Sequence, residues 1–255
     1  MPASYRSKGS IGYILPPRCN ETVIEEALAI RPPGLAWCFA SLAMADFGRD
    51  HFARALDAVE DAATQLVDRG VDVIVYSGVP LTAGQGATFH EQLEERLRAQ
   101  IATVPVVTDS QLIVQALGAL GVGRLSVVTP YRAETVLRVR ALFESHGFEV
   151  VDATGIELSL AQLLTDVDDD SAFLAACASF EAHPETEAFY LSCPQWPVVR
   201  AIERLEARTG KPVVTQLQAV LWWTMQVLEL SDDVPAMPLG RLMETRLTRP
   251  LAGTP

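Results

Sequence analysis

The amino-acid sequence predicts an α/β protein made of two pseudo-symmetric halves, each with a four-stranded parallel sheet and helices around it. Three observations predict this class. Short apolar runs alternate with longer amphipathic segments, the runs are unbroken as in strands covered on both faces, and landmarks of the first half recur in the second. Because ligands bind beyond the carboxyl ends of parallel strands, we expect the functional site in a cleft between the halves.

Eight short runs, rich in β-branched or aromatic residues and bounded by Gly, Pro or Asp, are predicted to be strands. In chain order they are Ser10–Leu15, Leu35–Leu42, Val71–Tyr76, Val104–Val107, Arg124–Val128, Phe148–Val151, Ala188–Ser192 and Pro212–Val214. Apolar residues recur at helical spacing between them. The predicted helices are Asp50–Arg69, Thr88–Ile101, Ser110–Leu120, Glu134–His146, Ser171–Ala182, Val198–Thr209 and Gln216–Leu228.

An internal repeat supports the division into halves. Three landmarks recur in the same order, each about 110 residues further along the chain. The pairs are Gly12–Arg18 with Ser126–Arg132, Val73–Gly78 with Ala188–Cys193, and Pro105–Thr108 with Pro212–Thr215. We therefore divide the chain into a first half (1–116), a second half (117–215) and a last helix and tail (216–255) that pack back on the first half.

Composition and charge narrow the classes of function. A net charge of −12 argues against a nucleic-acid binder, which needs a basic face, but leaves an anionic small-molecule substrate open. The four cysteines (Cys19, Cys38, Cys177 and Cys193) show neither disulfide nor zinc spacing, so reduced thiols are expected. No secretory signal or membrane span is expected, and the predicted compartment is the cytoplasm. The four histidines fall within or at the ends of helical patterns and are predicted to lie on the surface.

Cys193 is the strongest candidate for chemistry, because it ends an apolar strand and precedes a helix expected to begin near Pro194–Trp196. A helix N-terminus favours a thiolate, whereas apolar surroundings favour a thiol. The alternative is that Cys193 is a small buried hydrophobe. The position equivalent to it in the first half is Gly78.

With these landmarks, the sequence resembles the aspartate/glutamate/hydantoin racemase superfamily, in its maleate isomerase and arylmalonate decarboxylase branch, over nearly the whole chain. The matching segments are Ile11–Pro17, Val75–Gly78, Gly86 with Phe89, Pro105–Thr108, Ala116–Val122, Thr129–Tyr131, Leu191–Cys193 and Pro212–Thr215. Racemases and isomerases of the family that the sequence resembles use two cysteines that face each other, one from each half. The decarboxylases have a glycine in the first position and one cysteine in the second, as Gly78 and Cys193 do here. One proton donor is enough when loss of CO2 supplies the carbanion.

The resemblance also implies donors that hold the enediolate formed when CO2 leaves. Tyr131 matches a tyrosine of the decarboxylases, but Val79 and Pro80 replace their Thr-Ser pair, and Pro194 replaces a residue that would offer an N–H. Substitute donors are Asn20, which matches an asparagine of the maleate isomerases, together with Arg18, Thr108 and the Val79 N–H. Each side chain has an alternative: Arg18 as a solvated loop residue, Asn20 and Thr108 as helix caps. Ser77 is too weak an acid or base without a partner, and no partner is evident in the sequence.

We therefore predict a cofactor-independent decarboxylase of a small substituted malonate, without a metal, in which Cys193 protonates an enediolate held by Tyr131. The expected substrate-binding residues are Arg18, Asn20, Ser77, Gly78, Val79, Thr108, Pro194 and Gln195. The alternatives are an isomerase or racemase of a small carboxylic acid, an enzyme with Cys193 as nucleophile, and a catalytically silent ligand-binding relative. The expected partner is a small carboxylate, bound by a monomer or a homodimer.

Overall fold

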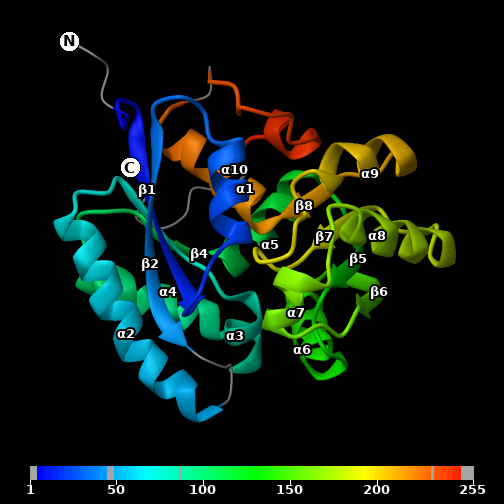
Figure 1. Ribbon diagram of the computed structural model, residues 1–255, viewed down its shortest axis with the longest axis horizontal. Helices are drawn as coiled ribbons and strands as arrows, with labels where there is room; N and C mark the ends of the chain where they lie inside the picture. The colour runs from blue at the N-terminus through cyan, green and yellow to red at the C-terminus, as the bar shows by residue number, and fades with distance from the viewer. Residues whose placement is uncertain (1–4, 45–48, 87, 231–232, 248–255) are drawn as a thin grey trace.

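The computed structural model describes residues 5–44, 49–86, 88–230 and 233–247, without the side chains of residues 49–57 and 160 (Figure 1). Two four-stranded sheets, in which every pairing is parallel, have the orders β2-β1-β3-β4 and β6-β5-β7-β8. The first sheet comprises β1 (Gly9–Pro17), β2 (Leu35–Met44), β3 (Val73–Tyr76) and β4 (Val106–Thr108). The second comprises β5 (Arg124–Thr129), β6 (Glu149–Gly155), β7 (Ala188–Leu191) and β8 (Val213–Thr215). The predicted α/β class and the eight strands are confirmed.

The pseudo-symmetry extends to the hydrogen bonds at the strand ends. Each sheet has its first strand in the same inner position, so β1 corresponds to β5 and β3 to β7. Beyond β3, the Ser77 N–H donates to Ile14 O at 2.9 Å, and beyond β7 the Ser192 N–H donates to Val128 O, also at 2.9 Å. The segments after these strands therefore begin from equivalent points of two similar scaffolds.

Seven of the helices follow the predicted segments. They are α2 (Arg49–Asp68), α4 (Phe89–Gln100), α5 (Asp109–Ala119), α6 (Ala133–Ser145), α8 (Ser171–Ala182), α9 (Ala201–Thr209) and α10 (Gln216–Val227). The further helical segments are α1 (Thr22–Ile30), α3 (Val79–Gly84), α7 (Leu160–Thr165) and a 3₁₀ turn at Arg241–Glu244. With six residues each, α3 and α7 are too short for a helical period to be recognised.

The helix expected to begin near Pro194–Trp196 begins later, at Ala201. Residues 194–200 form turns, in which the Trp196 N–H donates to Cys193 O at 3.0 Å. Pro194 and Pro197 lack the N–H that a continuous helix would use. The expectation that a helix N-terminus directly follows Cys193 was therefore wrong.

Helix α10 lies in the interior and contacts α5 and α1 of the first half (Figure 1). All its residues from Gln216 to Met225 are buried, so this uncharged helix is covered by the rest of the protein on every side. No helix in the described part of the chain is long and apolar enough to cross a membrane.

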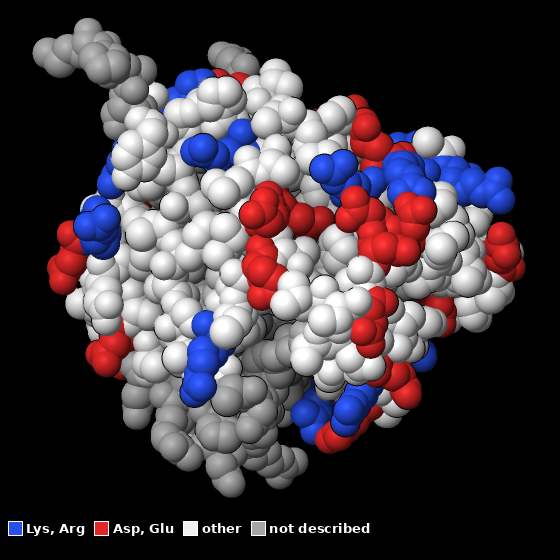
Figure 2. Space-filling model, viewed as in Figure 1, with Lys and Arg blue, Asp and Glu red and all other residues white. Residues whose placement is uncertain are grey.

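Figure 2 shows acidic side chains gathered on the right half of the face it presents. Asp170 pairs with Arg204 of α9 at 2.5 Å, and Asp169 with Arg200, the residue before α9, at 3.9 Å, so cations at the start of α9 face the acidic segment before α8. These groups are exposed, and each such pair contributes little to stability.

Candidate active site

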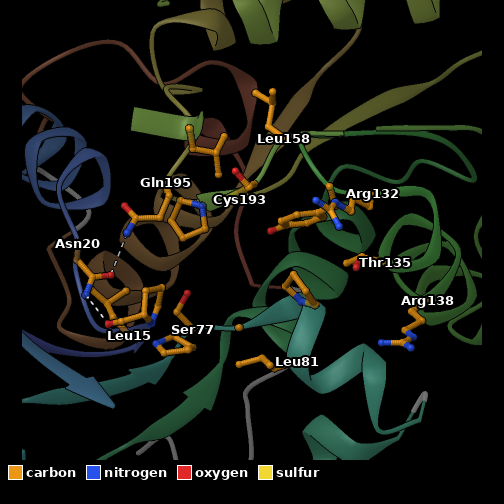
Figure 3. A pocket seen from close by; sticks show the side chains of 18 residues that line it. Leu15, Asn20, Ser77, Leu81, Arg132, Thr135, Arg138, Leu158, Cys193 and Gln195 are labelled. Carbon is orange, nitrogen blue, oxygen red and sulfur yellow. Dashed lines mark hydrogen bonds between the residues drawn. The ribbon is translucent and has the colours of Figure 1, made fainter. Parts of the chain in front are cut away.

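A cavity of about 240 Å³ lies between the two halves, beyond the carboxyl ends of β1, β3, β5 and β7 (Figure 3). Both halves line it. The lining residues are Leu15, Pro16, Pro17, Asn20, Ser77, Gly78, Pro80 and Leu81 from the first half, and Tyr131, Arg132, Thr135, Arg138, Leu158, Ser159, Leu163, Cys193, Pro194 and Gln195 from the second. Among these lining residues Cys193 is the one Cys, His, Asp or Glu, so the described wall does not offer the three ligands of a protein-held metal.

Seven of the ten predicted site residues line this cavity, and three do not. Arg18 is exposed, and its backbone N–H donates to Met44 O at 3.0 Å. Val79 is fully buried in α3. Thr108 is the N-cap of α5, as its alternative interpretation had it, and its hydroxyl also donates to Glu94 Oε1 at 2.8 Å.

Cys193 lies two residues beyond β7, with 3% of its surface exposed and a φ of +89°. A positive φ at a residue with a Cβ is strained and persists only where the surrounding structure holds it. Burial raises the pKa of its thiol to about 11, and hydrogen bonds from the Gln195 N–H and the Tyr131 hydroxyl offset only part of this rise. At neutral pH the side chain is therefore a thiol that can give a proton, rather than a standing thiolate nucleophile.

Tyr131 belongs to a short chain of hydroxyl groups beside Cys193. The Ser192 hydroxyl donates to Tyr190 Oη at 3.1 Å and lies 3.4 Å from Tyr131 Oη. Burial, followed by the proximity of Cys193, raises the pKa of Tyr131 well above its ordinary value. The phenol therefore stays protonated and can donate to an oxyanion in the cavity.

Ser77 has a partner after all, the buried carboxyl of Asp109 at the start of α5. The Ser77 hydroxyl donates to Asp109 Oδ2 at 3.1 Å, and the Gly78 N–H donates to the same oxygen at 3.0 Å. Asp109 is fully buried, and its burial raises the pKa of the carboxyl to about 7. The Gly78 N–H is thus already bonded behind the cavity wall.

Asn20 and Gln195 join the halves at the cavity rim (Figure 3). Gln195 Nε2 donates to Asn20 Oδ1 and to Cys19 O, each at 3.1 Å, while its Oε1 accepts from the Val23 N–H at 3.4 Å. The N-cap of α1 is Glu21, so the alternative in which Asn20 caps this helix is wrong. Its amide nitrogen instead donates to Pro17 O at 2.9 Å, which leaves one further N–H.

Two arginines of the second half line the cavity and were missed in the sequence. Arg138 is paired with Glu134, one turn earlier on α6. No carboxylate in the described part of the chain pairs with Arg132, the residue before α6. The internal repeat contained the signal, because it aligns Arg132 with Arg18, but the repeat does not reveal which of the two faces the cavity.

The chain is similar to known proteins over most of its length. Residues 11–243 match the family described as arylmalonate decarboxylase. A maleate isomerase of Pseudomonas putida is 29% identical over 236 residues, which cover 88% of this chain and 94% of that protein. Arylmalonate decarboxylase of Bordetella bronchiseptica is 26% identical over 216 residues, covering 85% and 89%.

The fold is shared as well. The crystal structure of the maleate isomerase Iso from Pseudomonas putida S16 has a TM-score of 0.82 and 26% identity, covering 92% of this chain and 98% of that one. The relatives are enzymes named for small carboxylates, and they include both lyases and isomerases. The chain belongs to the arylmalonate decarboxylase family.

Proposed function

We propose that the protein is a cofactor-independent decarboxylase of a small substituted malonate, in which Cys193 delivers a single proton. The observation that carries the proposal is the pairing of Gly78 with Cys193 at equivalent strand ends on the two sides of one cavity. Inversion at carbon needs an acid/base on each face, whereas loss of CO2 creates the carbanion and leaves one protonation to perform. A cavity wall with one thiol can supply the single protonation that decarboxylation requires.

In the proposed reaction, the bond between the α-carbon and one carboxylate breaks, and that carboxylate leaves as CO2. The electron pair stays on the α-carbon and is delocalised onto the remaining carboxylate as an enediolate. The Cys193 S–H then gives its proton to the α-carbon, and water reprotonates the thiolate. The raised pKa of Cys193 supports this role, because the thiol carries its proton before the reaction begins.

The lining residues supply the other requirements. Tyr131 Oη, the spare Asn20 N–H and the Arg132 guanidinium are donors that can hold a carboxylate or an enediolate. The side chains of Leu15, Leu81, Leu158 and Leu163 form apolar wall against which a neutral CO2 can leave. These donors take the place of the two hydroxyls absent at Val79 and Pro80.

The test is CO2 release from substituted malonates by the Cys193→Ala variant. Loss of a positioned general acid is expected to lower kcat by a factor on the order of 10²–10⁴. Cys177→Ala, a half-buried cysteine of α8 outside the cavity lining, is the matched control and should keep wild-type turnover. Undiminished CO2 release by folded Cys193→Ala protein would remove the proposal.

A cis–trans isomerase is the second candidate function. It is favoured by the maleate isomerase relative, which this chain matches over 94% of its length, and by Asn20, whose amide lines the cavity. Conversion of maleate to fumarate without CO2 release would replace the first proposal by this one. Exchange of an α-proton with solvent would point to a racemase, and binding of dicarboxylates without turnover to a catalytically silent relative.

A further inference from the structure

A second cluster of ligand groups lies where α4 of the first half meets α6 of the second. It comprises His90 and Glu91, in the first turn of α4, and His146, which directly follows α6. One ligand atom from each side chain lies within 4.8 Å of the other two, and His146 Nε2 is 4.0 Å from Glu91 Oε1. The two imidazole rings are 5.1 Å apart. None of these residues lines the cavity between Gly78 and Cys193.

Each histidine is oriented by an oxygen on one ring nitrogen. His146 Nδ1 lies 2.8 Å from Leu142 O, and because a carbonyl only accepts, Nδ1 is the donor and Nε2 is the nitrogen left to bind a metal. His90 Nε2 lies 3.2 Å from Gln111 Oε1, so Nε2 is held by the amide oxygen and Nδ1 is the nitrogen that would bind a metal. Metal-binding histidines usually donate the N–H of their second ring nitrogen to a carbonyl or carboxylate oxygen, which fixes the orientation of the ring.

The three side chains also differ in burial, which bears on how they could hold a cation. His90 is fully buried, so the prediction of a surface position was wrong for it, while the prediction for His51 lies outside the described side chains. The His146 and Glu91 side chains are 16% and 53% exposed. One ligand is thus fixed by packing, and the other two leave the cluster open to solvent.

We propose that His90, Glu91 and His146 bind a divalent cation of the zinc class, with water as the fourth ligand. Two imidazole nitrogens and one carboxylate oxygen suit Zn²⁺, Co²⁺ or Ni²⁺ better than Mg²⁺ or Ca²⁺. Metal–ligand distances of about 2.0–2.2 Å require the ligand atoms to approach one another by roughly 1 Å, which rotation of the partly exposed Glu91 and His146 side chains can supply.

The bound metal would tie the two halves together. Thr135 and Arg138 of α6 line the cavity, whereas His146 directly follows the C-terminal end of this helix, about 12 Å along the axis beyond Arg138. A cation held between α4 and α6 therefore restrains the relative placement of the two cavity walls from a distance, without contacting substrate.

The test is a titration with Zn²⁺ after treatment with a chelator, followed by calorimetry and by the thermal unfolding midpoint. All proteins carry Cys19→Ala, because that exposed thiol is a competing zinc ligand. We expect one Zn²⁺ per chain, a raised unfolding midpoint, and the visible absorption of tetrahedral Co²⁺ when cobalt replaces zinc. His146→Gln should abolish the absorption and weaken binding at least about tenfold, and Gln111→Leu, which leaves all three ligands in place, about 10–100-fold.

His183→Gln is the matched control, since His183 also lies beside carboxylates, 3.3 Å from Glu185 and 4.0 Å from Asp152, on another helix end. The His183→Gln protein should bind zinc with the same affinity as the Cys19→Ala parent. Glu91→Gln repeats the test at an exposed position, where loss of the fold is not expected. Absence of stoichiometric binding, or equal affinity in the parent, His146→Gln and Glu91→Gln proteins, would overturn the proposal.

Discussion

The segments after β3 and β7 start from equivalent backbone positions but direct their polar groups differently. In the first half, the Ser77 hydroxyl and the Gly78 N–H both donate to Asp109, behind the cavity wall. In the second half, the Ser192 hydroxyl donates to Tyr190 and lies near Tyr131, beside the thiol of Cys193. The residue equivalent to Asp109 is Gln216, whose buried amide has no hydrogen-bond partner in the described chain.

This difference shows that the two copies of a duplicated scaffold can take different roles. Both halves keep the strand-end serine, the positive φ that follows it, and a threonine that caps the next helix, Thr108 or Thr215. The first half uses these features to close a wall around a buried carboxyl. The second half presents an acid and a phenol to the cavity, so the proposed chemistry depends mainly on the second half.

The largest contrast is expected between the equivalent arginines. Arg132→Leu should raise the dissociation constant of a dicarboxylate by about tenfold, since a hydrogen bond to a charged group contributes roughly 1.5–3 kcal/mol. Arg18→Leu should change it by less than about twofold, because Arg18 is exposed and does not line the cavity. Calorimetric titration measures both constants. Equal losses in the two variants would show that the halves contribute alike.

A cysteine at position 78 tests whether the first half accepts the residue that the second half carries. A Cβ there would lie 3.2 Å from Tyr76 Oη and 3.3 Å from Pro16 Cγ, at a φ of +144°. We expect Gly78→Cys to lower the free energy of unfolding by about 1–3 kcal/mol and to add α-proton exchange, because its thiol would face Cys193. Gly118→Cys, at an open helical position, is the control for urea unfolding.

The pH dependence of the free energy of unfolding tests the contribution of Asp109, whose equivalent in the second half, Gln216, carries no charge. The pKa of Asp109 is raised from 3.8 to about 7 in the folded chain, so between these values the folded state binds more protons than the unfolded state. Stability is therefore lost as pH rises through this window, by up to about 1.4 kcal/mol per pH unit from this group.

Asp109→Asn should remove that share of the slope and gain stability relative to wild type as pH rises. Urea unfolding at several pH values across the window measures it. Parallel pH profiles for the two proteins would contradict the raised pKa of Asp109.

The smallest effect concerns the strain at Cys193. Its φ of +89° disfavours any residue with a Cβ, so Cys193→Gly should be more stable to urea than Cys193→Ala by about 0.5–1 kcal/mol. Neither variant retains the thiol, and both should show the same large loss of kcat. A less stable glycine variant would mean that the surrounding packing, rather than backbone strain, dominates at this position.

Much of the fold was predictable because its signals are local. Each strand is an unbroken apolar run between turn residues, and the repeat of Pro105–Thr108 as Pro212–Thr215 indicated two related sheets. The short α7 also had a readable signal, since Ser159 and Gln162 form a capping box at its start. The start of α9 could not be predicted from the local sequence. The side chain of Glu26, in the first half, accepts from the Val199 N–H at 2.9 Å within the preceding turns.

The candidate site was predictable in its positions but not in its partners. Strand ends pointed to Gly78, Tyr131 and Cys193 because the carboxyl edge of a parallel sheet follows from the order of elements. The bond from Ser77 to Asp109 joins residues 32 positions apart, and no spacing rule connects them. Arg18 and Arg132 occupy the same place in a repeated motif, and only their surroundings distinguish an exposed residue from a cavity wall.

The sequence by itself determined the α/β class, the doubling of the scaffold and the glycine–cysteine pair, since each depends on residue identity and short-range pattern. The tertiary structure decided which groups are buried away from water and which hydrogen-bond donors already have an acceptor. Burial keeps Cys193 a thiol and brings the pKa of Asp109 to about 7. Desolvation and hydrogen bonding depend on atoms that distant segments bring together, so they are settled only when the two halves pack.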